Sequence, residues 1–461
     1  MMHSGRFAGA GPLHGPGRLV LTIRQLRGVS HMRKSQFSSW VLACCLLPAM
    51  ALAAPRTWRD NSGKFTLEAE LVEADDEQVV LKTAQGRTVK VPRARLSEAD
   101  RRHLETLDAS TSDGPQADAE INAMLAQVCQ QTKVPALTAA IVNSDGLVAF
   151  GVAGVRKRGT RSPATQRDLW HLGSDTKAMT AALVASLVEQ GQLGWDTTLG
   201  EIFADDGIDI HPDLQGATVA QLLSHRAGLP ANLELKEYLG DDVVALRRRA
   251  LSELAKAPQS PPGETFSYSN LGYIIVGAII EKRTGKSWEE NIQKVVFAPL
   301  EMRSAGFGGL GTVGKVDQPW PHADDGKPVA GNGPKVDNPP VMGPAGRVHC
   351  SIQDWSRFIA DVLRGVAGGE ALLQPASYQR LTTPAGGADY ALGWIVTERG
   401  WAGGQVLQHS GSNTMNYATV WIAPKRDLAF LACCNQGGDV AAAACDAAVT
   451  ALISHPLAKE R

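Results

Sequence analysis

Neither sign of charge is in excess in this chain of 461 residues, which carries 46 lysines and arginines against 47 aspartates and glutamates. The formal net charge is −1. Nucleic-acid-binding proteins usually carry a basic surplus, so we expect no nucleic-acid partner. With 44% hydrophobic and 20% charged residues, the chain is too apolar to be disordered and long enough to bury more than one core.

Several motifs for metal, phosphate and nucleophile chemistry are missing. No pair of histidines has His-x-x-x-His spacing and no pair of cysteines has Cys-x-x-Cys spacing. The glycine-rich stretch 308–346 lacks the Gly-Lys-Ser/Thr of a phosphate loop, and no serine lies in a Gly-x-Ser-x-Gly elbow. We therefore expect neither a metal nor a cofactor, and no Ser-His-Asp triad of the elbow type.

Acidic residues are absent from residues 1–53, which contain several basic ones and end in an apolar run from Trp40. Ala51-Leu52-Ala53 is a small-x-small cleavage signal. This pattern predicts a signal peptide, and the apolar run is shorter than the roughly 20 residues that a membrane span needs. We expect no stable membrane span after the signal is removed.

Met32 is the preferred start of this signal, because Arg33 and Lys34 then form a short basic region before the apolar run. Residues 1–31 would be an upstream extension. The expected location is the periplasm or cell envelope, and a lipoprotein anchored through Cys44 is the second interpretation. The cysteines beyond the signal are odd in number, so buried free thiols are favoured over disulfides, whose pairing stays open.

The rest of the chain divides into two domains of different pattern. Residues 56–107 show short alternating apolar segments typical of a small strand meander, and a capping pattern opens a helix after Ser97. Residues 108–116 are polar and contain glycine and proline, as a linker does. In residues 117–455, strand patterns at both ends enclose helical patterns, which predicts one sheet built from distant segments.

The first candidate for catalysis is a serine and a lysine three residues apart, Ser174 and Lys177, at the start of an apolar helix. On a helix these two side chains share one face. A lysine buried against apolar residues can lose its proton readily and serve as the base that serine needs. Gly173, immediately before the serine, lets the backbone approach closely, and the helix N-terminus offers N–H groups where an oxyanion could form. A solvated helix face is the competing interpretation.

Two further motifs carry polar groups. Tyr268 and Asn270 stand in a loop before the apolar helix that ends at Gly285, and a phenol near cationic groups ionises more readily and can shuttle protons. His409-Ser410-Gly411-Ser412 lies where a strand begins or ends, and Gly411 would leave room for a substrate backbone. Each motif alone has an ordinary structural explanation, namely a buried tyrosine and a turn.

Taken together, the three motifs resemble those of the penicillin-recognising serine hydrolases, the superfamily of class C β-lactamases and DD-peptidases. The similarity extends to Val219–Leu229 and Tyr390–Trp394 and covers about residues 117–455. It implies an α/β fold in which an antiparallel sheet is flanked by helices and joined by an all-helical lobe. Residues 56–107, from Arg56–Asp60 to Leu96-Ser97, resemble a Sla-type homology domain, an SH3-like β-barrel. The resemblance implies a binding or spacer role toward a protein or cell-envelope ligand, and simple packing against the neighbouring domain is the alternative.

The resemblance also implies roles for individual residues. Ser174 would be the acylated nucleophile, and Lys177 and Tyr268 would take and return its proton. Asn270 would hold a substrate amide, and the backbone N–H groups of Ser174 and Ser412 would bind the oxyanion. Ser410 and Gly411 would border the substrate beside them. His409 replaces a lysine found in many members.

Three questions stay open from the sequence. A mostly neutral His409 attracts a carboxylate less than lysine does, which disfavours β-lactam hydrolysis and leaves peptidase, aminopeptidase and esterase activities. A binding protein that uses its N-terminal barrel and has a catalytically retired hydrolase domain is the alternative function. Residues 308–346 form either an active-site rim, with Trp320 and His322 as substrate contacts, or a plain surface loop. His225 is interpreted as a helix-end residue.

Overall fold

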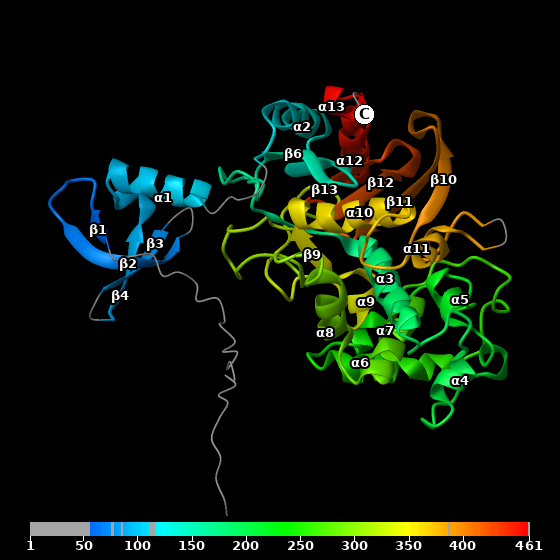
Figure 1. Cartoon of the computed structure of the whole chain (residues 1–461). Coiled ribbons are helices and arrows are strands. Elements are labelled where there is room, and N and C mark those ends of the chain that lie inside the picture. The colour runs from blue at the N-terminus through cyan, green and yellow to red at the C-terminus, as the bar shows by residue number, and fades with distance from the viewer. Residues whose placement is uncertain (1–55, 75–77, 84–85, 111–115, 386–387, 460–461) are drawn as a thin grey trace, which may run out of the picture. The chain divides into compact units, whose positions relative to one another are not determined.

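The computed structural model describes residues 56–74, 78–83, 86–110, 116–385 and 388–459 (Figure 1). The predicted signal peptide and upstream extension lie outside these residues, as does 111–115 of the predicted linker. The N-terminal domain and the larger domain are described separately below.

The N-terminal domain is a four-stranded antiparallel meander in the order β1-β2-β3-β4, followed by one helix. Its core contains Trp58, whose indole N–H donates to the Ala69 carbonyl oxygen at 3.0 Å. The predicted cap is present, because Ser97 Oγ accepts from the Asp100 backbone N–H at 3.1 Å. The helix continues to Ser110, so the first part of the predicted linker is helical. The elements are β1 (Arg56–Arg59), β2 (Thr66–Ala74), β3 (Gln78–Thr83), β4 (Thr88–Pro92) and α1 (Glu98–Ser110).

The larger domain contains a six-stranded antiparallel sheet in the order β10-β11-β12-β13-β5-β6. The hairpin β5–β6 near the start of the domain pairs through β5 with β13 near its end. The predicted sheet from distant chain segments is therefore confirmed. Its strands are β5 (Ala136–Asn143), β6 (Gly146–Gly154), β10 (Ile395–Arg399), β11 (Gly404–Ser412), β12 (Tyr417–Ala423) and β13 (Leu428–Cys434).

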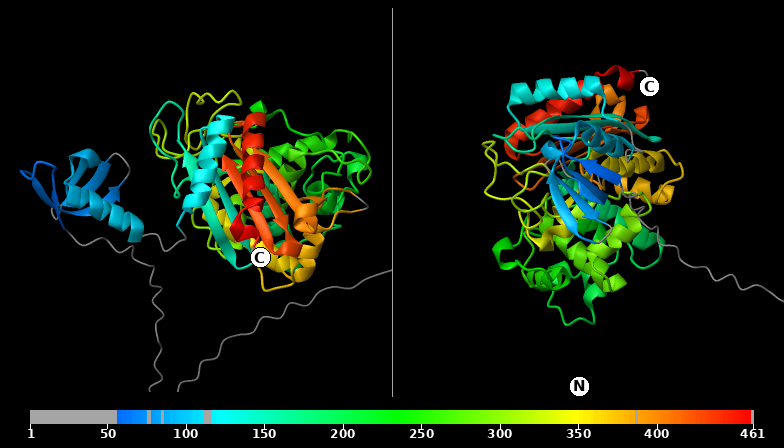
Figure 2. Two further views of the ribbon diagram at one scale, coloured as in Figure 1. Left: turned by 90° about the horizontal axis from the view of Figure 1, so that it is seen from above. Right: turned by 90° about the vertical axis from the view of Figure 1, so that its left-hand side faces the viewer.

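Helices cover both faces of this sheet. α2 (Ala119–Thr132) and α12 (Gly438–Ile453) lie side by side on one face, as the left view of Figure 2 shows, and share a core with β5 and β13. α10 (Ile352–Val366) packs on the opposite face. The free cysteines Cys433, Cys434 and Cys445 are buried in these layers and Cys350 is buried elsewhere in the domain, as expected, whereas the free Cys129 of α2 is only partly buried.

The segment between β6 and β10 forms a lobe of helices with a small sheet at its border. The small sheet has the order β7-β9-β8 and leads directly into the turn that carries Ser174. Its strands are β7 (Leu169–His171), β8 (Gly306–Phe307) and β9 (Val348–Ser351). The other helices of this segment are α3 (Thr176–Glu189), α4 (Leu199–Phe203), α5 (Val219–Leu223), α6 (Val243–Ala250), α7 (Asn270–Thr284), α8 (Trp288–Ile292), α9 (Gly343–Gly346) and α11 (Pro375–Thr382), while the short α13 (Pro456–Lys459) follows α12.

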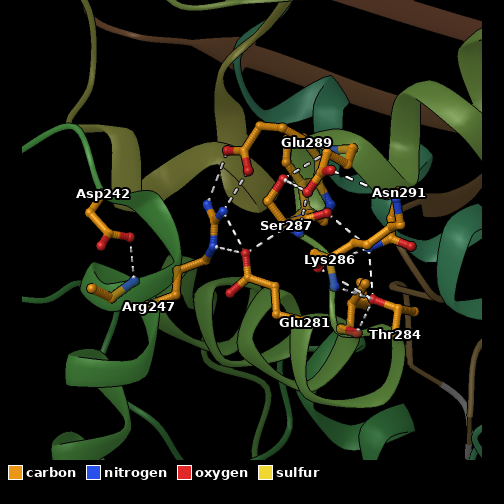
Figure 3. Close-up of polar contacts among 12 residues, drawn as sticks. Asp242, Arg247, Glu281, Thr284, Lys286, Ser287, Glu289 and Asn291 are labelled. Atoms are coloured by element: carbon orange, nitrogen blue, oxygen red, sulfur yellow. Dashed lines mark hydrogen bonds and ion pairs between the residues drawn. The ribbon is translucent and has the colours of Figure 1, made fainter.

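A buried arginine joins three helices of this lobe (Figure 3). Arg247 of α6 donates from Nε to Glu281 of α7 at 2.8 Å and from Nη2 to Glu289 of α8 at 2.5 Å. Gly343, the first residue of α9, lies against this cluster, because a Cβ placed there would come within 2.7 Å of Glu289 Oε1. The cluster thus supports α9, which contributes a backbone acceptor to the candidate active site.

Candidate active site

Ser174 lies in the 3-10 turn Gly173–Asp175 between β7 and α3, and its side chain is partly exposed. Gly173 has φ 51°, in the left-handed region that glycine adopts without strain. A Cβ on Gly173 would lie 2.3 Å from the Ser412 backbone nitrogen. A Cβ on Gly411 would lie 1.9 Å from the Leu172 carbonyl oxygen. Two glycines therefore allow the nucleophile turn and β11 to touch.

This contact corrects one expectation from the sequence. The missing side chain of Gly411 makes room for the turn that bears Ser174 and not for a substrate backbone. A Cβ on residue 411 would lie 2.5 Å from the Ser174 backbone nitrogen. Ser410 is also engaged within the sheet, since its hydroxyl lies 3.0 Å from Thr419 Oγ1 and accepts from Gln408 Nε2 at 2.6 Å. Of the predicted motif on β11, Ser412 is the residue that lines the pocket beside Ser174.

Lys177, the second residue of α3, is fully buried and points at Ser174. Its Nζ lies 3.1 Å from Ser174 Oγ, 2.7 Å from Asn270 Oδ1 and 2.7 Å from the Ala345 carbonyl oxygen. Burial lowers the pKa of Lys177 to about 7, although the nearby Asp175 carboxyl opposes the shift. The neutral amine is therefore well populated near neutral pH.

The three neighbours of Lys177 accept its N–H bonds in the protonated form, and they also accommodate the neutral amine. Asn270 Oδ1 and the Ala345 carbonyl oxygen can only accept, so they take the two N–H bonds of a neutral amine. The nitrogen lone pair is then left for the hydroxyl proton of Ser174. This arrangement is the one that a general base for a serine nucleophile requires.

Tyr268 stands on the other side of Ser174 and forms a hydrogen bond with it. Burial raises the pKa of the Tyr268 phenol, and this outweighs the bond to Ser174. The expected easily ionised phenol is therefore wrong. Its imidazole neighbours supply no positive charge, because burial lowers the pKa of His225 well below its usual value and that of His409 to about 3. Tyr268 is a neutral hydroxyl that can donate to Ser174.

Asn270 is the first residue of α7 and not part of the loop before it. Its amide is oriented by two partners, since Oδ1 accepts from Lys177 and Nδ2 donates to Asn232 Oδ1 at 2.8 Å. Asn270 and Asn232 both line the pocket in front of Ser174. Asn270 thus contacts the amine of Lys177 and also forms part of the pocket wall.

His409 lies beside the other predicted residues but faces away from the pocket. Its imidazole is 3% exposed, and Nε2 lies 3.0 Å from the Tyr390 hydroxyl while Nδ1 lies 3.0 Å from the Ser410 carbonyl oxygen. Because a carbonyl oxygen only accepts, Nδ1 carries the proton and Nε2 accepts from Tyr390. Both ring nitrogens are thereby used within the protein.

The aromatic residues around Tyr268 form a wall behind the site. His225 follows α5 with φ 59°, as expected of a helix-end residue, and its ring centroid lies 4.2 Å from that of Tyr268. Nδ1 of His225 accepts from the Ser269 backbone N–H at 3.0 Å. His225 therefore fixes the loop that carries Tyr268 by a backbone hydrogen bond and ring packing.

The pocket in front of Ser174 has a volume of about 430 Å³. None of the described residues that line it carries an ionisable side chain. The lining consists of Ser174, Asn232, Leu233, Leu235, Asn270, Asn338, Met342, Ala345, Gly346, Ser412, Asn413 and Thr414. Four asparagine side chains make it a neutral surface rich in amide donors and acceptors.

Two predicted rim residues do not reach this pocket. His322 is fully buried, and its Nε2 accepts from the Arg158 backbone N–H at 3.1 Å while Nδ1 lies 2.7 Å from the Asn435 carbonyl oxygen. Trp320 is buried and donates its indole N–H to the Val329 carbonyl oxygen at 2.9 Å. The interpretation of both as substrate contacts is therefore wrong. Asn338 and Met342, from the same stretch, do line the pocket.

Sequence reasoning missed the partners that come from remote segments. The Ala345 carbonyl oxygen, Asn232 and Tyr390 each contact a predicted site residue. A backbone carbonyl leaves no signal in a sequence, whereas Tyr390 lay within a stretch already noted for its resemblance. Within the described ranges, no group of three or more His, Cys, Asp or Glu side chains is placed to hold a metal ion.

Among the described residues, no helix is both long and apolar enough to cross a bilayer.

Comparison with known proteins gives the following relatives. Penicillin-binding protein 4 of Amycolatopsis lactamdurans is 28% identical over 277 residues, which are 57% of this chain and 68% of that protein. Unguisins hydrolase ungD of Aspergillus violaceofuscus (strain CBS 115571) is 24% identical over 347 residues, 66% of this chain and 58% of that protein. The chain thus spans little more than half of the Aspergillus protein.

Solved structures share the fold of the larger domain. The octameric penicillin-binding protein homologue from Pyrococcus abyssi superposes with a TM-score of 0.60 at 24% identity, covering 74% of this chain and 78% of that one. SurE gives a TM-score of 0.60 at 24% identity, covering 73% and 75%. The SLA1 homology domain 1 pattern matches residues 48–111, and the β-lactamase pattern matches residues 118–454. The chain therefore belongs to the β-lactamase family and carries an SLA1 homology domain 1 ahead of its β-lactamase domain.

Proposed function

We propose that this protein is an exported serine hydrolase that forms an acyl-enzyme at Ser174 with an amide or ester substrate. The observation that carries the proposal is the contact between Ser174 and Lys177, a buried amine whose pKa is lowered to about 7. Membership in a family that includes hydrolases and penicillin-binding proteins supports the reaction class.

The reaction begins when Lys177 takes the hydroxyl proton and Ser174 Oγ attacks the substrate carbonyl carbon. Negative charge develops on the carbonyl oxygen, toward which the backbone N–H groups of Ser174 and Ser412 would donate, a pair worth a few kcal/mol of barrier. The tetrahedral intermediate collapses, and the leaving nitrogen or oxygen receives the proton from Lys177 by way of the Tyr268 hydroxyl. Proton transfer by a placed base contributes about 10²–10⁴-fold.

Deacylation uses the same groups in reverse. Water enters the place of the leaving group and gives a proton to the base as it attacks the ester of Ser174. The ester bond to Oγ breaks, Ser174 regains its proton, and the product leaves as a carboxylic acid. No group beyond those named and one water molecule is consumed.

The substrate that suits this site carries no charge beside the bond that is cleaved. The pocket is lined by neutral side chains, and His409 is a neutral imidazole whose nitrogens are already bonded. Among the residues that line the pocket, a substrate carboxylate would find no cationic side chain to compensate for the hydration it loses. We infer a preference for neutral amides or esters over β-lactams and over peptides cleaved next to a free carboxylate.

Export is the second part of the proposal, and it depends on the basic and apolar pattern within residues 32–53. Fractionation of cells that make the full chain, followed by N-terminal sequencing, tests it. Protein that begins at Ala54 in the envelope fraction is the expected result. Full-length protein confined to the cell interior would contradict it.

The activity is tested with a pair of p-nitrophenyl esters that share one chain length and differ by a terminal carboxylate, with nitrocefin as a third substrate. We expect kcat/KM for the neutral ester to exceed that for the charged one by about tenfold or more, a difference of about 1.4 kcal/mol, because the carboxylate is desolvated without a paired cation. Ser174→Ala should abolish turnover. Turnover that survives this substitution contradicts the proposal, and a folded protein inert toward all three substrates favours the binding-protein alternative.

A further inference from the structure

One buried carboxylate, Asp337, receives hydrogen bonds from both sides of the nucleophile. Its side chain is fully buried in the stretch before α9. Oδ2 lies 3.0 Å from His171 Nε2, and Oδ1 accepts from Asn413 Nδ2 at 2.8 Å. Arg347 Nε lies 3.3 Å from Oδ2 and balances the charge. His171 is three residues before Ser174, and Asn413 directly follows Ser412.

The His171 side of this network has a fixed hydrogen pattern. His171 Nδ1 accepts from the Gly173 backbone N–H at 3.1 Å, so Nδ1 carries no proton. Nε2 must then carry the proton and donate it to Asp337. The carboxylate thus selects the tautomer that holds the Gly173 amide and, through it, the turn whose next residue is Ser174.

The Asn413 side is equally constrained. Asn413 Oδ1 accepts from the backbone N–H groups of Met415 and Asn416, at 3.2 Å and 2.9 Å, and from Asn416 Nδ2 at 3.1 Å. The amide group is therefore oriented with Nδ2 toward Asp337 and cannot be reversed without losing these bonds. This fixes the turn that follows β11 and so the backbone at Ser412.

We propose that Asp337 is a positioning residue that couples the backbone at Ser174 to the backbone at Ser412 and so keeps the two oxyanion donors at one spacing. The proposal concerns the same site as the proposed function and depends on it for its catalytic consequence. Asp337 acts through His171 and Asn413 and does not touch the substrate. Each end of the coupling is a single carboxylate oxygen, so one substitution breaks it.

Asp337→Asn is the direct test, because an amide of the same shape offers only one acceptor oxygen. The new NH₂ group then faces either Asn413 Nδ2 or His171 Nε2, and two donors cannot bond to each other. If His171 changed tautomer so that Nε2 could accept from this NH₂ group, Nδ1 would carry the proton and the bond from the Gly173 backbone N–H would be lost. We expect kcat for a neutral ester to fall about 10- to 100-fold, as for misplaced catalytic groups, with KM little changed. Amide hydrogen exchange by mass spectrometry should rise about tenfold in peptides covering 171–176 and 411–416.

Asp361→Asn is the matched control. Asp361 of α10 is also buried, accepts from the Leu372 backbone N–H at 2.9 Å and from the Tyr378 hydroxyl, and lies beside Arg364. We expect this variant to lose stability while kcat and exchange in both peptides stay at the wild-type values. The double variant Asp337→Asn with Asn413→Ser should lose no more kcat than the more damaged single variant.

The outcomes separate the two proposals. Exchange that stays unchanged in Asp337→Asn, or rises in one peptide alone, overturns the coupling, whatever the activity. A fall in kcat that Asp361→Asn reproduces also overturns it. If the wild-type protein shows no turnover at all, the proposed function fails, and hydrogen exchange in the two peptides still decides whether Asp337 couples them.

Discussion

Lys177 is the residue whose protonation controls the proposed chemistry. Its Nζ is surrounded by two obligate acceptors and the nucleophile, and burial brings its pKa to about 7. The unfolded chain keeps the ordinary lysine value of 10.5. Between these two pH values the unfolded state binds more protons, so the contribution of Lys177 to the free energy of unfolding rises with pH across this window.

The first prediction is a pH profile. The proposed base is the neutral amine, so kcat/KM for a neutral ester should rise about tenfold per pH unit below the Lys177 pKa of about 7 and level off above it. Lys177→Arg keeps a positive charge at every accessible pH and should lower kcat/KM at least about 100-fold. Stopped assays across pH 5–9, with stability measured at each pH, check this. A profile flat over that range would contradict the role of Lys177.

For individual residues, the sequence predicted contacts between residues that are close along the chain and missed contacts between residues that are far apart along it. Ser174 lies in the turn before α3 and Lys177 on its first turn, and the three-residue spacing still brings Lys177 Nζ to 3.1 Å from Ser174 Oγ. The prediction that Tyr268 ionises easily was wrong. Burial, which a sequence does not report, raises the pKa of its phenol by more than the hydrogen bond to Ser174 lowers it. Asp337 could not have been found, since its partners His171 and Asn413 lie far away along the chain on both sides.

At the scale of elements, the contact between β11 and the nucleophile turn decides where Ser174 sits. The two segments meet through glycine, and no heavy atom could occupy the Cβ position of Gly411, 1.9 Å from the Leu172 carbonyl oxygen. β11 pairs with β12 along most of its length, so it resists local displacement. A methyl group at position 411 can therefore be accommodated only if the turn that carries Ser174 moves away from β11.

Gly411→Ala should for this reason lower kcat about 100-fold, the effect of a displacement of about 1 Å in the reacting groups. Gly400→Ala, just before β11, is the control, because a Cβ there meets nothing within 4 Å. Both variants should bind the neutral ester with similar KM. Equal kcat for the two variants would show that the close approach is not needed for activity.

Arg247 gives a prediction for stability alone. Its removal leaves Glu281 and Glu289 without their shared cation, and burial already raises the pKa of Glu281. We expect Arg247→Met to lower the free energy of unfolding by about 3–5 kcal/mol, as for other broken buried pairs. Arg248→Met, on the exposed side of α6, should change it by less than about 0.5 kcal/mol. Urea denaturation of both variants checks this, and equal midpoints would contradict it.

Elements whose apolar residues recur at regular spacing were predictable from the sequence, and segments without such spacing were not. β5 and β6 follow from an apolar hairpin around Asp145-Gly146, and α10 from its regular apolar face. Residues 308–346 have little regular structure, so sequence pattern could not say which of them reach the pocket. Trp320 and His322 are chemically suited to a substrate, but their backbone partners hold them inside the fold.

At the scale of the whole molecule, the site assembles from segments that the sheet and the helical lobe bring together. Its residues run from His171 to Asn413, and all belong to the larger domain. The SLA1 homology domain has its own core around Trp58. The chemistry should therefore not depend on the N-terminal domain.

A chain that begins at Gln116 should keep the wild-type kcat/KM for a small neutral ester, because every residue of the site is retained. The comparison is made with the same ester and with thermal unfolding of both chains. A truncated protein that stays folded but loses turnover would contradict the assignment of activity to the larger domain alone.

The central claim is that Ser174 becomes acylated with Lys177 as its base. Reaction with a fluorophosphonate, followed by mass spectrometry of the intact protein and of its peptides, measures this most directly. The account predicts one adduct, located on the peptide that contains Ser174, absent from Ser174→Ala and formed at least about 100-fold more slowly in Lys177→Arg. Labelling of Ser174→Ala at the wild-type rate, or a folded wild-type protein that takes no label, would contradict it.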